Sequence, residues 1–165
     1  MKHTQKMFRL IGKGRHILVP VITMKDSKQI LTSIIRTTQM GQNGIRAILP
    51  ASMRPGLRKA LQAQLLEYDA IETEAHSIAS QRGWELPESD PGLQFLSRLM
   101  TKTRLAYGNP DSKIADMMIQ DNTRRMVRCL KDLHQSTKED PQVGVLSQRL
   151  LDCQSAGIRQ LQSYL

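Results

Sequence analysis

This chain has 165 residues, of which 39% are hydrophobic but only 4% are aromatic. That length is enough to bury a core without disulfides or bound metal, and the aliphatic bias, with nine Met, favours packed helices over a sheet sandwich. The two cysteines, Cys129 and Cys153, form neither a disulfide framework nor a zinc-type spacing. No apolar run approaches the roughly 20 residues that span a bilayer. We therefore expect a soluble, cytoplasmic, all-helical protein with free thiols.

The formal net charge of +9 is concentrated in the N-terminal third. Residues 1 to 54 contain ten basic residues and one acid, and the remaining 14 basic and 14 acidic residues cancel one another. Residues 1 to 25 contain no acid and include Gly12, Gly14 and Pro20, so they are predicted to form a basic N-terminal arm, with a short strand-like piece at residues 17 to 22. The candidate anion-binding residues of the arm are Lys2, Lys6, Arg9, Lys13 and Arg15. They could bind nucleic-acid phosphates or an anionic surface, and the alternative is a solvated tail.

Two long helices are predicted after the arm. The first begins at Asp26 or Ser27, either of which can act as an N-cap, and runs to about Leu49. The second runs from about Pro55 to Gly83. The predicted core stripes are Leu31, Ile34, Thr38, Gly41, Ile45 and Ile48 in the first helix and Leu57, Leu61, Gln64, Tyr68, Ile71, Ala75 and Ile78 in the second.

The second half of the chain contains one short predicted helix, at residues 92 to 107, and two long ones. The first long one begins with Asp111 or Ser112 as N-cap and ends near residue 135, and the last begins near Asp140 and Pro141. Their predicted core stripes are Ala115, Ile119, Asn122, Met126, Cys129 and Leu133, then Val143, Leu146, Leu150, Cys153, Gly157, Leu161 and Tyr164. A basic cluster on the first of these helices, Arg124, Arg125, Arg128 and Lys131, is interpreted as a solvated face.

Four helices of similar length predict one domain at residues 26 to 165, an antiparallel up-down four-helix bundle with an additional short helix. Three segments, residues 112 to 123 (SKIADMMIQDNT), the hairpin with Met40-Gly41 and Leu49-Pro50, and residues 150 to 161, resemble small uncharacterised bacterial proteins of the ferritin-like superfamily. The resemblance implies a ferritin-like bundle, often a homodimer, whose metal-bearing relatives oxidise or store iron.

Those relatives place Glu on two helices and Glu-x-x-His on the other two, because two hard cations need converging carboxylates and imidazoles. This chain lacks Glu-x-x-His, since Ala70, Ala75 and Ser77 follow its three central Glu at that spacing. A non-standard site for iron or another divalent metal could use Glu67, Glu72, His76, Asp121 and Asp152. The competing interpretation of His76 is a surface pair with Glu72, four residues earlier.

Neutral polar residues stand near the middle of the predicted stripes instead of metal ligands. They are Thr38, Gln64, Tyr68, Asn122 and Gln154. Amides and hydroxyls can satisfy one another and fix helix register without a metal, so we interpret these residues as a polar core layer. Gly41 and Gly157 lie on the same stripes and predict close helix approach, because Gly otherwise costs about 1 kcal/mol in a helix. The resulting expectation is a non-enzymatic structural or interaction module, a homodimer with an unidentified protein partner and without a cofactor.

Overall fold

A computed structural model describes residues 25–51, 53–86, 109–135 and 140–165. Over these residues the prediction of an all-helical fold is confirmed, with four long helices: α1 (Ser27–Ile48), α2 (Pro55–Gln81), α4 (Pro110–His134) and α5 (Pro141–Leu161), followed by a 3₁₀ turn, η1 (Gln162–Tyr164). The basic arm, including its strand-like piece, and the short helix predicted at residues 92 to 107 lie outside the described residues. None of the four helices is long and apolar enough to cross a membrane.

The helix starts follow from their capping residues. The Asp26 side chain accepts from the Gln29 backbone N–H at 2.8 Å, and the Gln29 side chain accepts from the Asp26 backbone N–H at 3.2 Å, which forms a capping box. Helix α5 begins where it was predicted to begin, and the Asp140 side chain caps it by accepting from the Val143 backbone N–H. The predicted N-cap of α4 is wrong: Asn109 caps this helix instead of Asp111 or Ser112, because Pro110 occupies the first helical position and the Asn109 side chain accepts from the Asp111 backbone N–H.

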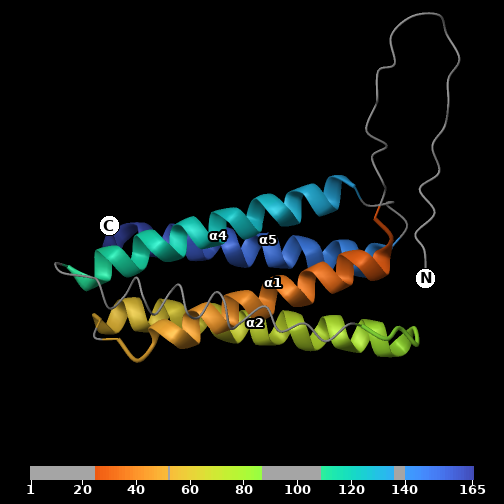
Figure 1. Cartoon of the computed structure of the whole chain (residues 1–165), viewed down its shortest axis with the longest axis horizontal. Helices are drawn as coiled ribbons and strands as arrows, with labels where there is room; N and C mark the ends of the chain where they lie inside the picture. The colour runs from red at the N-terminus through yellow and green to blue at the C-terminus, as the bar shows by residue number, and fades with distance from the viewer. Residues whose placement is uncertain (1–24, 52, 87–108, 136–139) are drawn as a thin grey trace, which may run out of the picture.

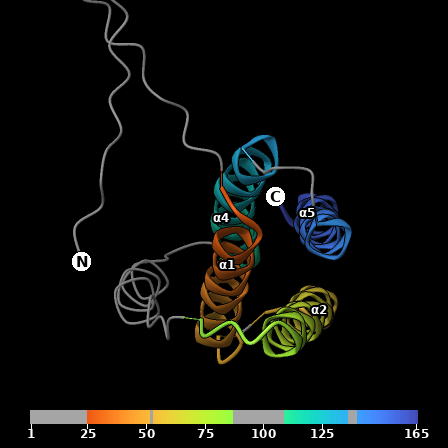
Figure 2. The same ribbon diagram turned by 90° about the vertical axis from the view of Figure 1, so that its right-hand side faces the viewer.

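The four helices lie alongside one another along the long axis of the molecule (Figure 1). The turn between α1 and α2 lies at one end of the molecule, together with the start of α4 and the C-terminus. The ends of α2 and α4 and the starts of α1 and α5 lie at the other end. Viewed along this axis, the helices occupy the corners of a square (Figure 2), and α2 packs against α1 and α5, which are the partners of α4 as well.

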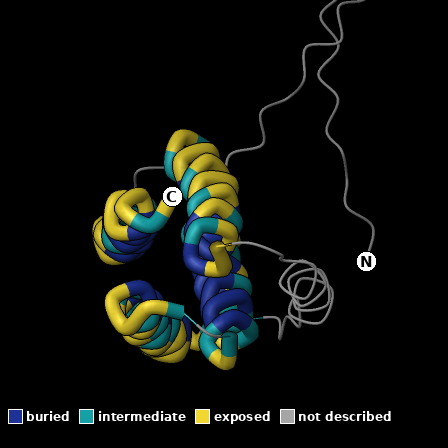
Figure 3. Tube along the Cα trace, turned by 90° about the vertical axis from the view of Figure 1, so that its left-hand side faces the viewer, coloured by how far each residue is buried: buried dark blue, intermediate teal, exposed yellow. Residues whose placement is uncertain are grey.

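The core occupies the space between the four helices, where their buried positions face inward (Figure 3). Every predicted stripe residue of α1 and α2 is buried, and those of α5 are buried through Leu161. Both cysteines are free and buried, as predicted. The interior therefore combines aliphatic packing with the neutral polar side chains that the sequence places on the same faces.

Helix α4 departs from its predicted stripe. Ile119, Met126 and Leu133 lie half-buried at the edge of the interface, while Asp121, Arg125 and Asp132 are buried. The prediction of one solvated basic face is therefore wrong for Arg125, although Arg124, Arg128 and Lys131 are exposed. The physical reason is pairing. Each buried charge of α4 has an oppositely charged partner, which offsets the loss of hydration: Arg125 pairs with Asp121, Asp132 with Lys25 and Asp111 with Arg54.

Candidate functional site

Three of the predicted polar-layer residues form a hydrogen-bonded cluster between α2 and α4. The Gln64 amide nitrogen donates to the Asn122 side-chain oxygen at 3.0 Å and to the Tyr68 hydroxyl at 3.1 Å. The Tyr68 hydroxyl in turn donates to the same Asn122 oxygen at 3.1 Å. Gln64 is 5% exposed and the other two are fully buried, so the cluster joins the two helices within the core. Helical spacing explains the grouping, because Gln64 and Tyr68 lie one turn apart on one face of α2.

A permanent cation completes this cluster. The Arg125 guanidinium donates to the Asn122 oxygen at 3.0 Å, pairs with the Asp121 carboxylate, and lies 6.0 Å from the centre of the Tyr68 ring. Arg125 is only 3% exposed, and its Nε atom has no hydrogen-bond partner among the described residues. Because an arginine stays protonated in proteins, the layer carries a fixed positive charge with one compensating carboxylate.

Two glycines make room for the cluster. A Cβ atom at Gly41 of α1 would lie 2.4 Å from Cε2 of the Tyr68 ring, and one at Gly157 of α5 would lie 2.6 Å from the Gln64 amide nitrogen. Both contacts are shorter than van der Waals packing permits. A residue with a Cβ atom at either position would therefore push the helices apart, and glycine allows α1 and α5 to approach these side chains closely. Close approach is the arrangement that the two glycines predict.

The other two residues assigned to the layer are buried but do not join it by a hydrogen bond among the described residues. The Thr38 hydroxyl donates to the Ile35 carbonyl of its own helix at 2.8 Å. Gln154 is fully buried, and neither of its amide atoms has a partner in the described part of the chain. An amide buried without a partner costs free energy, so Gln154 adds no hydrogen bond to the layer on the α5 side among the described residues.

Burial keeps the Tyr68 phenol and the two cysteine thiols neutral. Desolvation raises the pKa of Tyr68 to about 12, although the nearby Arg125 charge opposes the rise. Desolvation likewise raises the pKa values of the Cys129 and Cys153 thiols to about 12. A thiol is nucleophilic as the thiolate, so neither cysteine is activated at neutral pH. The cluster holds two helices together by hydrogen bonds, and these three groups offer no acid or base that titrates near pH 7.

The candidate metal ligands on α2 have other partners. Glu67 accepts from Arg149 Nε at 2.6 Å, which connects α2 to α5. Glu72 accepts from the amide nitrogens of Gln39 and Gln42 of α1, and lies 3.7 Å from His76 Nε2 in the pair expected from their spacing.

The two remaining candidate ligands are equally separate. Asp121 pairs with Arg125 in the core, whereas Asp152 is exposed on α5 and accepts from the Gln148 amide at 3.0 Å. No group of three or more His, Cys, Asp or Glu side chains is placed to hold a metal ion within residues 25–51, 53–86, 109–135 and 140–165.

A second polar group, around Asp132, is not apparent from the sequence. Its carboxylate accepts from the Ser33 hydroxyl of α1 and pairs with the Lys25 ammonium group, while the Lys25 backbone N–H donates to the Gln135 carbonyl at 2.8 Å. This group connects the start of α1 to the end of α4. In the sequence Asp132 is one acidic residue on a predicted helix, and that alone does not distinguish a core position from a surface one. The five cations of the predicted anion-binding arm lie outside the described residues.

No protein-family model matches this chain, and no curated protein matches it. Among solved structures, the crystal structure of a DUF305 fragment from Deinococcus radiodurans is similar, with a TM-score of 0.66 and 14% sequence identity. The match covers 83% of this chain and 93% of that fragment. At this identity the likeness shows the fold alone, which is the helical fold of a domain of unknown function.

Proposed function

We propose that this chain is a non-enzymatic helical-bundle protein, ferritin-like in architecture but built without a di-metal centre, which acts as a structural or interaction module. The observation that carries the proposal is the buried Arg125 in the polar layer. A fixed guanidinium charge repels a divalent cation, and Arg125 is paired with the buried Asp121 carboxylate. The other members supply neutral amides and a phenol that burial keeps protonated.

The residues present therefore do not fit a di-iron group, because such a group needs several carboxylates and imidazoles with free lone pairs. In place of a metal, the Arg125 guanidinium supplies the positive charge around which polar side chains of two helices converge. A hydrogen-bonded layer of this kind specifies the register of α2 against α4, since sliding either helix by one turn would leave its buried polar groups unpaired.

The same proposal includes the antiparallel ferritin-like topology, a homodimer and a cytoplasmic location. The positions of the helix ends in Figure 1 support the topology, because each pair of neighbouring helices in the square begins at opposite ends of the molecule. Two free, buried thiols are consistent with a reducing compartment.

Metal loading tests the proposal. Purified protein is incubated with ferrous iron under oxygen, then desalted and analysed for bound iron by elemental analysis, with oxidation followed by absorbance. We expect no stoichiometric iron and no oxidation faster than in buffer alone. A stable species with two irons per chain would overturn the proposal. In that case the variant with Glu72→Ala and His76→Ala, checked for helical content by circular dichroism, would lose the iron if the alternative carboxylate and histidine site holds it.

A further inference from the structure

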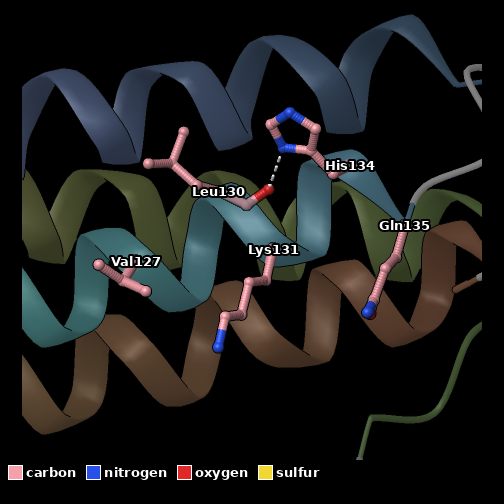
Figure 4. A pocket seen from close by; sticks show the side chains of 5 residues that line it. All are labelled: Val127, Leu130, Lys131, His134 and Gln135. Atoms are coloured by element: carbon pink, nitrogen blue, oxygen red, sulfur yellow. Dashed lines mark hydrogen bonds between the residues drawn. The ribbon is translucent and has the colours of Figure 1, made fainter.

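The outer face of the C-terminal half of α4 contains a shallow hollow of about 410 Å³. Its lining residues are Val127, Leu130, Lys131, His134 and Gln135. In Figure 4 the side chains of Leu130 and His134 extend toward α5, and those of Lys131 and Gln135 extend toward α1. The His134 ring nitrogen Nδ1 lies 2.8 Å from the Leu130 carbonyl oxygen, which holds the ring at the edge of the hollow.

Two aliphatic side chains that line the hollow are exposed. Val127 is 44% exposed and Leu130 is 40% exposed, and they lie three residues apart, on the same side of the helix. Exposed aliphatic side chains grouped around a hollow mark a contact surface more often than scattered ones do.

Three exposed cations lie on the same half of α4, and one of them, Lys131, lines the hollow. Arg124, Arg128 and Lys131 are exposed, and no ion pair joins any of them to another described residue. The two carboxylates on this half of α4, Asp121 and Asp132, are buried and already paired with Arg125 and Lys25. The face therefore combines exposed aliphatic side chains with cations that form no ion pair with a described residue. The exposed carboxylate of α4, Asp116, lies eight residues before Arg124 and accepts from the Gln120 amide.

We propose that the α4 face, defined as Arg124, Val127, Arg128, Leu130 and Lys131, binds an acidic amphipathic segment of a partner protein. This inference rests on the interaction role proposed above and specifies the chemistry of the partner. A helix with aliphatic residues on one side and Glu or Asp beside them would fill the hollow and place its carboxylates against the three cations. Nucleic-acid phosphates would pair with the cations but leave the aliphatic side chains of Val127 and Leu130 exposed to water. The two aliphatic residues therefore favour a peptide.

The test is a fluorescence-anisotropy titration of the full chain with a labelled synthetic helical peptide that carries Leu at i, i+4 and Glu at the flanking positions. A peptide with Lys in place of each Glu is the control ligand. We expect saturable binding of the acidic peptide that weakens as salt is added, and no binding of the basic peptide. Failure of the acidic peptide to bind would overturn the docking proposal, whereas only iron uptake bears on the metal-free core.

Two pairs of variants locate the binding surface. The charge variant, Arg124→Gln, Arg128→Gln and Lys131→Gln, is matched by Arg36→Gln, Lys59→Gln and Arg159→Gln, which remove three exposed cations from other helices. The apolar variant, Val127→Ser and Leu130→Ser, is matched by Leu66→Ser and Val145→Ser, which change side chains exposed by 70% and 67% elsewhere.

Each α4 variant should bind the acidic peptide with about tenfold lower affinity than the parent. Each matched control should bind it with an affinity within about twofold of the parent. Circular dichroism of all four variants excludes unfolding as the cause. Equal weakening by a variant and its control would overturn the proposal. Sensitivity to the charge variant without sensitivity to the apolar variant would overturn it as well, and would indicate binding of polyanions such as nucleic acid or anionic vesicles.

Discussion

Arg124 and Arg125 are adjacent in the sequence, yet they occupy opposite environments. Arg124 is exposed on the outer face of α4, where no described residue forms an ion pair with it. Arg125 is 3% exposed and interacts with Asp121, Asn122 and the Tyr68 ring inside the core. One residue step rotates a helical side chain by about 100°, and that step separates a core cation from a surface cation.

The difference shows that the same side chain serves two purposes according to its partners. A buried guanidinium needs an anion and hydrogen-bond acceptors because it has lost its hydration, and the core supplies them. An exposed guanidinium keeps its water and remains free to meet an acidic ligand. Helix α4 therefore places one cation where it organises the core and others where they remain open to solvent. Substitutions in the core should cost far more stability than substitutions on the exposed face.

Removing the buried charge should have the largest effect. Arg125→Ala leaves the Asp121 carboxylate buried without its partner and removes a donor from Asn122, so we expect a loss of about 3–5 kcal/mol in the free energy of unfolding. Arg124→Ala, one residue earlier, should change it by less than about 0.5 kcal/mol. Urea unfolding followed by circular dichroism measures both. Similar costs for the two variants would contradict the placement of Arg125 in the core.

A shift to alkaline pH should have the second largest effect, by lowering the free energy of unfolding. The pKa of Tyr68 rises from 10.0 to about 12 on folding, so the folded state holds the phenol proton more tightly than the unfolded chain does. The resulting stabilisation is present below pH 10 and is lost as the pH rises toward 12, by on the order of 3 kcal/mol. Folding also raises the pKa values of the Cys129 and Cys153 thiols, from 9.0 to about 12. Their contribution to the stability of the folded protein is therefore lost in the same direction, from pH 9 upward.

Tyr68→Phe isolates the phenol from the other titrating groups. At pH 8 the variant should be less stable than the parent by about 1 kcal/mol, because it lacks the hydroxyl hydrogen bonds. Between pH 10 and 12 the parent should lose more stability than the variant, so their stability curves should cross. Parallel curves from urea unfolding across this range would show that the phenol is not shielded in the fold.

Two glycine substitutions should change the free energy of unfolding in opposite directions. Gly41→Ala forces a Cβ atom against the Tyr68 ring and should destabilise the protein by about 1–3 kcal/mol. Gly144→Ala meets no atom within 4 Å and should stabilise α5 by up to about 1 kcal/mol through helix propensity. Thermal unfolding of both variants provides the comparison. Stabilisation by Gly41→Ala would mean that α1 does not approach Tyr68 closely.

Much of the fold is predictable because apolar spacing and capping chemistry are local signals. The stripes of α1 and α2 and the N-caps at Asp26 and Asp140 lie where those signals place them. The orientation of α4 is not predictable in this way. Spacing rules treat charged residues as exposed, whereas Arg125 and Asp132 are buried through partners, one on its own helix and one before α1.

The candidate site was predictable in composition but only partly in connection. Neutral polar residues at stripe positions indicated a polar layer, and Gln64, Tyr68 and Asn122 do contact one another. The part played by Arg125, which donates to the same Asn122 oxygen as Gln64 and Tyr68, could not be inferred, because it depends on the rotation of α4 about its own axis. Gln154 shares their burial but not their hydrogen bonds, which a one-dimensional pattern cannot distinguish.

The contact between Gly41 and Tyr68 also limits how this sequence can change over evolutionary time. A larger residue at position 41 becomes acceptable only after the ring at position 68 has been replaced by something smaller, so the order of the two substitutions matters. Loss of the ring would in turn release Gln64 and Asn122 from the hydroxyl that they share. Positions 41, 64, 68 and 122, on three helices, should therefore covary among homologues. A homologue without the ring at position 68 should also differ at the other three positions.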